Sequence, residues 1–356
     1  MRVDGMNRRV VVVGSGSFGR SVSYALATEL PVPAEVLVLA RDPGKAAEVA
    51  FVATARAGVS GVPATFRSAE LAADRLDDLL GAARPEVLIH CVSQQSPWEG
   101  RMAPSAWTRF VAAAGFGVTL PLQAALVLDV AASLRRVAPD CLLINACFPD
   151  AVNPVLAEHD LPVFCGAGNI ATIAASLRVT FAAAAEFLLL AHHAHLHEPA
   201  DPADEARLWV DGVEQEDVGA LLAPMRSARA ELNQVGGHTA ARLVADLLAE
   251  PGTGLRTHLP GPRGLPGGYP VRIAGHKIEL RLPDGLDVDA AVAWNQRMAV
   301  HDGVVVQDGQ VGFPPRTAEV LRAQVPAMAD GYPVHDIRAA CAELLELRAR
   351  LRTSRG

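Results

Sequence analysis

The fold class is predicted from one stretch of the sequence, Val11-Val12-Val13-Gly14-Ser15-Gly16-Ser17-Phe18-Gly19. It is a GxGxxG pattern that directly follows a short apolar run and opens a helical pattern. In that context the first glycine permits a tight turn, the second lets the backbone approach a pyrophosphate, and the third lets the helix pack on the strand. A turn that binds nothing is the alternative. We expect a nucleotide-binding loop formed by Gly14, Ser15, Gly16, Ser17, Phe18 and Gly19.

Short β-branched runs alternate with longer Ala-rich helical patterns through the first half of the chain. This alternation is typical of βαβ units around a parallel sheet that helices cover on both faces. We therefore predict an α/β protein with a doubly wound parallel sheet. The predicted strands cover residues 10–13, 36–39, 87–91, 142–144 and 163–165, and the clearest helices cover 21–30 and 43–57.

The second half of the chain has a less regular pattern. A long strand is expected at 187–197, and an exposed loop is expected in the Gly/Pro-rich stretch 251–268, whose backbone cannot satisfy itself in regular structure. The other predicted elements are a strand that runs into a turn at 209–212, helices from about residue 221, hairpins at 269–282 and 304–313, and a final helix at 334–352.

Composition and charge indicate a folded protein with a small partner. Of the 356 residues, 50% are apolar and 20% charged, as in ordinary globular proteins. The net charge of −7 argues against nucleic acid or an anionic membrane as the partner. We find no apolar stretch of the roughly 20 residues that span a membrane and no signal-peptide pattern, so we expect a cytoplasmic protein. Five cysteines without a CxxC pair indicate neither a disulfide framework nor a zinc knuckle.

The end of the second predicted strand bears on the choice of cofactor. An acidic side chain at this place accepts hydrogen bonds from the 2′-hydroxyl of an NAD ribose, whereas an arginine suits the 2′-phosphate of NADP. Ala40 stands where the acid is expected and Arg41 follows it, so NADP is favoured over NAD. A shift of one residue would instead bring Asp42 near the ribose. The alternative role for Asp42 is the N-cap of the following helix.

Several further segments carry a resemblance to a known family. They are Arg41, the stretch 91–101, Pro149-Asp150, Gly166-Ala167-Gly168, the His-rich segment from His192, Gly236-Gly237-His238-Thr239-Ala240 and Tyr269-Pro270-Val271. With these residues the chain resembles the lactate/malate dehydrogenase superfamily. The resemblance implies a Rossmann-type dinucleotide-binding domain at 1–166, a mixed α/β catalytic domain at 167–300 and a C-terminal hairpin-plus-helix extension at 301–356. It also implies hydride transfer at nicotinamide C4 and a homodimer or homotetramer.

The chain departs from that superfamily where the substrate would be held. In the family an Asp that orients the catalytic His and an Arg that binds the substrate carboxylate follow the Gly-x-Gly segment. Thr172 and Ala175 occupy those places here. Alanine offers no hydrogen-bond donor, so we do not expect an ordinary 2-hydroxy acid as the substrate. Arg178 or Arg242 would have to replace the missing guanidinium.

His192-His193-Ala194-His195-Leu196-His197 is the most unusual composition in the chain. On a strand, His193, His195 and His197 would share one face. His193 falls where the resemblance places the catalytic His, and an imidazole can give or take the proton that accompanies hydride transfer. A divalent metal held by the three imidazoles and a solvated strand are the alternatives.

Polar residues beyond the predicted strand ends complete the candidate site. Asn145 and Asp150 are expected to take part in catalysis, with helix capping as the alternative for Asp150. Arg101 occupies the place of the family's substrate-covering loop and is expected to polarise the reacting carbonyl, or else to be a surface charge. The expected substrate-binding residues are Asn153, Asn169, His195, His238 and Thr239, with a helix cap as the alternative for Asn169.

These residues predict an NAD(P)-dependent oxidoreductase that transfers a hydride between NADP(H) and a carbonyl or imine substrate. Two alternatives remain open. A metal- and nicotinamide-dependent glycosidase-like enzyme would use His193 or His195 with Cys147 around a divalent ion. A non-catalytic protein would bind the nucleotide without turnover.

Overall fold

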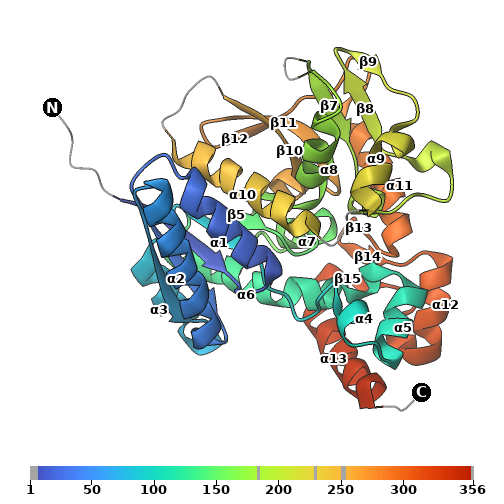
Figure 1. The fold of residues 1–356 in the computed structure, drawn as a ribbon. Coiled ribbons are helices and arrows are strands. Elements are labelled where there is room, and N and C mark those ends of the chain that lie inside the picture. The colour runs from blue at the N-terminus through green and yellow to red at the C-terminus, as the bar shows by residue number, and fades with distance from the viewer. Residues whose placement is uncertain (1–6, 183–184, 228–230, 250–253, 354–356) are drawn as a thin grey trace.

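A six-stranded parallel sheet forms the centre of the first half of the chain (Figure 1). The computed structural model describes residues 7–182, 185–227, 231–249 and 254–353. The strand order β3-β2-β1-β4-β5-β6 reverses direction beside β1, so the sheet is doubly wound as predicted. Its strands are β1 Arg8–Val13, β2 Ala34–Ala40, β3 Ala64–Glu70, β4 Val87–His90, β5 Leu142–Asn145 and β6 Cys165–Gly166.

The continuous apolar runs of these strands are explained by burial on both faces of the sheet. In β1, Val10 and Val12 pack into one hydrophobic cluster, whereas Val11 and Val13 pack into another on the opposite face. Each of the four valines is at most 1% exposed. The sheet therefore has no solvent-facing side at β1, and alternation of polar and apolar residues is not required there.

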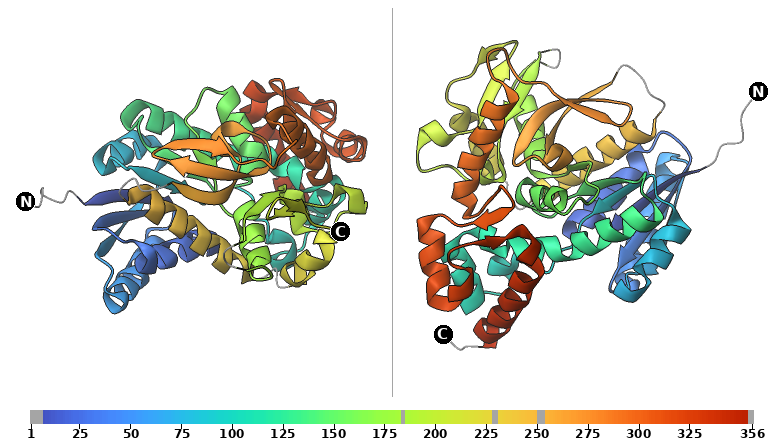
Figure 2. Two further views of the ribbon diagram at one scale, coloured as in Figure 1. Left: turned by 90° about the horizontal axis from the view of Figure 1, so that it is seen from above. Right: turned by 180° about the vertical axis from the view of Figure 1, so that it is seen from behind.

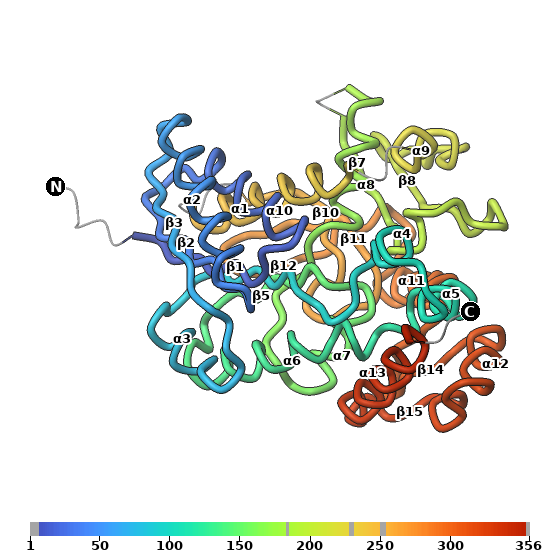
Figure 3. Tube along the Cα trace, turned by 60° about the horizontal axis from the view of Figure 1, so that its bottom comes forward, coloured from blue at the N-terminus to red at the C-terminus, as the bar shows by residue number. Residues whose placement is uncertain are grey.

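Helices cover both faces of the sheet. On one face lie α1 Ser17–Glu29 and α2 Pro43–Ser60, and α10 Leu232–Leu248 runs alongside α1 (Figure 3). The other face carries α3 Leu76–Ala83, α6 Leu120–Val137 and α7 Pro149–Glu158. Two shorter helices, α4 Glu99–Met102 and α5 Ala106–Ala114, follow β4. This arrangement leaves the carboxyl ends of the parallel strands open toward the second half of the chain.

Helix α6 corrects one expectation about membrane-spanning segments. Within the described residues, the helical segment Phe116–Val137 is long and apolar enough to cross a membrane, with a mean hydropathy of 1.6. Burial accounts for this composition, because 78% of its most apolar window lies inside the fold. Most of its apolar side chains pack into one hydrophobic cluster, as those of the core helix of a folded domain do.

The second half of the chain begins with two three-stranded antiparallel sheets. An exposed loop is expected at 251–268; residues 251–253 lie outside the described residues, and the rest of the stretch contains β10, which pairs with β11 along its whole length and buries Leu259. The backbone pairing of this short strand with β11 outweighs the local Gly/Pro signal. The elements are α8 Asn169–Arg178, β7 Phe187–Leu190, β8 Arg207–Val210, β9 Val213–Glu214, α9 Val218–Ser227, β10 Leu255–Pro260, β11 Gly268–Ala274, β12 Lys277–Leu280 and α11 Val288–Asp302.

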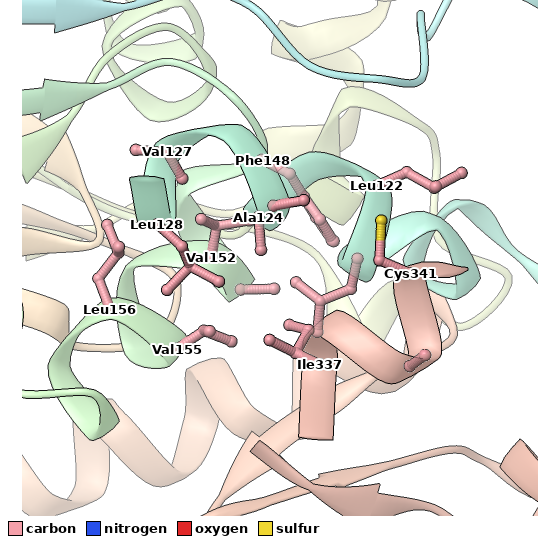
Figure 4. Packing of buried hydrophobic residues seen from close by; sticks show 14 of the residues in the cluster. Leu122, Ala124, Val127, Leu128, Phe148, Val152, Val155, Leu156, Ile337 and Cys341 are labelled. Carbon is pink, nitrogen blue, oxygen red and sulfur yellow. The ribbon is translucent and has the colours of Figure 1, made fainter. Parts of the chain in front are cut away.

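The C-terminal elements return to the helices of the first half, as Figure 2 shows from behind. They are β13 Val305–Gln307, β14 Gln310–Gly312, α12 Pro315–Gln324, β15 Tyr332–Pro333 and α13 Ile337–Thr353. Ile337 and Cys341 of α13 share one core with Leu122 and Leu128 of α6 and with Val155 of α7 (Figure 4). The predicted hairpins and final helix are therefore present, and the division at residues 166 and 300 stays a prediction.

Candidate active site

The glycine-rich loop connects β1 to α1 at the carboxyl edge of the sheet. Gly14 has φ +121°, and a Cβ there would approach the Cys91 carbonyl oxygen to 3.0 Å. At Gly19 a Cβ would collide with the Gly14 carbonyl, so this glycine allows the helix to pack on the strand. At Gly16, by contrast, an added Cβ would meet nothing within 4 Å. The loop therefore has room beside Gly16 and the α1 N-terminus, as a pyrophosphate requires.

A cavity of about 350 Å³ opens next to this loop. Its walls come from segments that follow β1, β4, β5 and β6, together with residues 193–196 and the start of α10. A larger cavity of about 980 Å³ lies at the opposite edge, against Arg8, Val87 and Leu142 near the amino ends of β1, β4 and β5. Open parallel sheets bind ligands at the carboxyl ends of their strands, so we place the site in the smaller cavity.

The His-rich segment is not the predicted strand. Strand β7 ends at Leu190, and residues 193–196 form a 3₁₀ helix. Its first turn is held by side chains, because Nδ1 of His192 accepts from the N–H of Ala194 and Nδ1 of His195 accepts from the N–H of His192. His193, His195 and His197 therefore do not share the common face that a strand would have given them. Among the described residues no group of three or more His, Cys, Asp or Glu is placed to hold a metal ion.

His193 lines the cavity and is paired with a carboxylate that the sequence did not predict. Its Nδ1 lies 2.8 Å and 2.9 Å from the two carboxylate oxygens of Asp302, the last residue of α11. The aromatic rings of Phe116 and Phe148 pack against the imidazole at centroid distances of 5.5 Å and 5.1 Å. Phe148 has φ +47°, and this left-handed backbone sets its ring against His193. The imidazole is thereby fixed in orientation by one ion-pairing partner and two rings.

Asp302 is 5% exposed and touches two histidines. Burial by itself would raise its pKa, but the charge and hydrogen bonds of His193, with His192 close by, outweigh burial and hold the pKa of Asp302 well below its ordinary value. The carboxylate is therefore ionised near neutral pH and accepts a hydrogen bond from His193 Nδ1–H. No local motif marks Asp302 in the sequence, because it comes from a helix end 109 residues beyond His193.

Asp150 holds the backbone of the same histidine. Its Oδ1 accepts from the His193 N–H at 2.9 Å, and its Oδ2 accepts from Asn169 Nδ2 at 2.8 Å. The capping alternatives for both residues are wrong: α7 starts at Pro149 after Phe148, and Asn169 is the first residue of α8 after Gly168. Asp150 is 1% exposed and does not line the cavity, whereas Asn169 does.

Asn145 and Asn153 are buried behind the cavity wall. Asn145 Nδ2 donates to Asn153 Oδ1 at 2.9 Å, and Asn153 Nδ2 donates to the Gly261 carbonyl at 2.9 Å. Asn145 Oδ1 also accepts from the N–H of Cys147. These bonds shape the loop after β5, and neither amide side chain lines the cavity.

His195 is also placed outside the cavity. It is 1% exposed, its Nε2 lies 2.9 Å from the Asp204 carbonyl, and its ring stacks on Trp294 at 5.4 Å. Burial lowers the pKa of His195 to about 4, so the ring is neutral at physiological pH. Its contacts support the 3₁₀ helix that carries His193.

The remaining predicted site residues lie on the periphery. Arg101 is exposed at the end of α4, with its guanidinium carbon 5.9 Å from the centroid of Trp98, which lines the cavity. On α10, His238 is half-exposed beside Glu29, and Thr239 lines a separate cavity of about 510 Å³. Asp42 caps α2 by accepting from the Lys45 N–H at 3.1 Å, as its alternative interpretation predicted.

Neither Arg178 nor Arg242, the two arginines that could replace the missing guanidinium, lines the cavity. Arg178 donates to the Ala185 carbonyl and lies over the Phe187 ring, and Arg242 bonds Glu29 at 3.0 Å on the surface of α10. Thr172, at the place of the family's Asp, does line the cavity, and its hydroxyl donates to the Gly168 carbonyl. Both functions of the family's Asp-Arg pair are thus absent from α8.

The chain has the fold of the lactate and malate dehydrogenases. It is similar to a lactate dehydrogenase from Cryptosporidium parvum, solved with lactic acid and nicotinamide adenine dinucleotide, at 15% identity and a TM-score of 0.54, over 83% of this chain and 97% of that one. It is also similar to a malate dehydrogenase from Archaeoglobus fulgidus in complex with NADH, at 16% identity and a TM-score of 0.52, over 82% and 95% of the two chains. No family model and no curated protein matches the sequence.

Proposed function

We propose that this protein is an NAD(P)-dependent oxidoreductase that moves a hydride between NADP(H) and a carbonyl or imine. The pairing of His193 Nδ1 with Asp302 at 2.8 Å, in a cavity that opens beside the glycine-rich loop, carries this proposal. It joins a group that can transfer a proton to a loop that can hold a dinucleotide. The dinucleotide complexes of the structurally similar dehydrogenases support the same reaction class.

The residues of the loop fit a dinucleotide. Gly16, Ser17 and Phe18 line the cavity, and the first N–H groups of α1 point from the same loop. Asn233 Nδ2 donates to Ser17 Oγ and closes the loop against α10. A bound nicotinamide would supply or accept the hydride at its C4 atom.

His193 holds the proton that accompanies the hydride. Asp302 keeps the proton of Nδ1 in place, so Nε2 is the nitrogen that exchanges a proton with the substrate oxygen or nitrogen. Asp150 fixes the backbone of His193 through the bond to its N–H. The rings of Phe116 and Phe148 pack against the imidazole and reduce its contact with water, which strengthens the His193–Asp302 interaction. Arg101 is the proposed group that polarises the carbonyl when the loop over the cavity closes.

The proposed preference for NADP rests on the end of β2. Arg41 is exposed there, where a 2′-phosphate of the adenosine ribose would come to lie. The carboxylate of Asp42 is occupied with the N-terminus of α2 and lies 3.6 Å from Lys45 Nζ. The homodimer or homotetramer stays a prediction that sedimentation velocity would test.

A matched pair of glycine variants tests nucleotide binding. A Cβ at Gly16 or at Gly58 of α2 meets nothing within 4 Å, so both positions have open space for a side chain, and G16V and G58V form a matched pair. The side chain introduced at position 16 would occupy the place of the pyrophosphate. We expect G16V to weaken NADPH binding by more than about tenfold in a fluorescence titration, at an unchanged melting temperature. G58V should keep the wild-type affinity. Equal affinities in both variants and the wild type, or no NADPH binding at all, would refute the proposal.

A further inference from the structure

The charge composition of the cavity lining bears on the class of substrate that the site would take. Among the described residues that line it there is no arginine, lysine, aspartate or glutamate. The polar groups are hydroxyls and amides, such as Ser93, Thr172, Asn169 and Asn233. Burial raises the pKa of the Cys147 thiol to about 12, so this side chain is also neutral at physiological pH. The wall therefore offers hydrogen bonds but no permanent counter-charge.

The charges behind the wall disfavour an anion. Asp302 and Asp150 both contact His193, one through the imidazole and one through the backbone N–H. The bonds of Asp150 come from two neutral donors, the His193 N–H and the Asn169 amide. A substrate carboxylate beside His193 would thus lie near two acidic side chains, and the nearest cation, the His193 imidazolium, is already paired with Asp302.

Aromatic side chains surround the proton donor instead. Phe116 stacks on the His193 ring with an interplanar angle of 27°, Phe148 meets it edge-on at 69°, and Trp98 covers the same cavity from the loop after β4. Aromatic walls of this kind favour flat apolar groups through dispersion and offset or edge-to-face stacking. Arg101 lies outside this lining, and its proposed role is at the carbonyl oxygen, so the described lining offers a carboxylate no arginine or lysine.

We infer that the substrate is a neutral aryl ketone, or the secondary alcohol formed from it, an inference that rests on the proposed function. In the reductive direction the carbonyl carbon gains a hydride from the reduced nicotinamide, and the carbonyl oxygen gains a proton from His193 Nε2. The C=O π bond is broken, and the products are the alcohol and the oxidised nicotinamide. His193 then recovers its proton from solvent. The oxidation of the alcohol is the reverse of these steps.

Two reagents that differ in charge test the inference by turnover. Benzoylformate and its methyl ester present the same phenyl ketone, one as an anion and one as a neutral molecule. With NADPH as the reductant, we expect kcat/KM for the ester to exceed that for the acid on the order of 100-fold, because a buried unpaired charge is strongly disfavoured. Equal values, or faster reduction of the acid, would overturn the inference and leave the oxidoreductase proposal intact.

Binding provides a readout that does not depend on turnover. Benzamide should bind to the wild-type protein with NADPH at least about tenfold more tightly than benzoate in a calorimetric titration. W98A should lose this affinity on the order of tenfold, whereas W98F, which keeps an aromatic ring, should retain most of it. Failure of both ligands to bind, or tighter binding of benzoate, would overturn the inference. Preferred binding of benzamide without reduction of any ketone would support the neutral site and refute the oxidoreductase proposal.

Discussion

At the scale of single residues, the proposed chemistry depends on two side chains that are far apart in the sequence. Thr172, which the sequence resemblance places where the family has its carboxylate, donates its hydroxyl to the Gly168 carbonyl. The carboxylate that contacts His193 comes instead from Asp302 at the end of α11. An orienting carboxylate can occupy any element that brings it within hydrogen-bond distance of Nδ1, because its role is electrostatic and geometric.

Substitutions in this pair should reduce turnover without affecting the nucleotide. We expect H193N to lower kcat by about 100- to 10,000-fold, the range of general acid-base catalysis, with NADPH affinity unchanged. D302N should lower kcat by at least about 100-fold and shift the pH profile to lower pH, because the neutral amide no longer stabilises the imidazolium. D204N is the matched control, since Asp204 pairs with His301 at 2.9 Å outside the cavity. Full activity in H193N under single-turnover conditions would contradict the assignment.

Arg41 should determine the choice between the two nicotinamide cofactors. Replacing its guanidinium in R41A should cost roughly 1.5 to 3 kcal/mol of NADPH affinity, the range of a charge-assisted hydrogen bond. NADH affinity should change little, which makes NADH the internal control. Fluorescence titration of both nucleotides against both proteins measures the difference. Equal affinities of the wild type for NADPH and NADH would show that Arg41 does not bind the 2′-phosphate.

At the scale of elements, the C-terminal helix is part of the main core. α13 packs on α6, and the side of α13 that faces α6 and α7 carries Ile337, Cys341 and Leu344. The loop that follows α6 and β5 supplies Phe148 to the cavity, so the packing of α13 supports the site from behind. A helix that ends the chain can in this way contribute to the rigidity of a site it does not touch.

Ile337 tests this coupling between the last helix and the core. It is 1% exposed, so I337A should lower the free energy of unfolding by about 2 to 5 kcal/mol through lost burial and a cavity. E343A, at an exposed position of the same helix, should change it by less than about 0.5 kcal/mol. Urea denaturation monitored by circular dichroism measures both. If I337A unfolded at the same urea concentration as the wild type, α13 would contribute little to the stability of the core.

At the scale of the whole molecule, the fold holds several buried or half-buried histidines as neutral rings. Burial lowers the pKa of His90 and of His195 to about 4 and that of His258 to about 3. Each of them has an ordinary pKa near 6.5 once the chain unfolds. The unfolded chain therefore binds protons between pH 6.5 and 4 that the folded protein does not bind.

Stability should accordingly be complete above about pH 6.5 and should fall as the pH decreases toward 4. The slope is at most about 1.4 kcal/mol per pH unit for each of the three histidines. H90L removes one of these groups at a similar side-chain volume and should flatten the slope by about a third. H276Q, at an exposed turn between β11 and β12, should leave the slope unchanged. Denaturant titrations at pH 7, 6 and 5 would contradict the account if stability rose on acidification.

The sequence by itself determined five of the six strands of the parallel sheet, the glycine-rich loop and the two hairpins, because each depends on local patterns of apolar residues and glycines, whereas β3 Ala64–Glu70 was not predicted. The sequence also singled out His193, because its place before Ala194 matches that of the catalytic His in the family that the chain resembles. Only the tertiary structure showed the 3₁₀ helix at 193–196, since side-chain bonds to the backbone outweighed the strand pattern. The partner Asp302 and the aromatic wall of Phe116 and Phe148 come from separate elements, and only chain folding brings them to one imidazole.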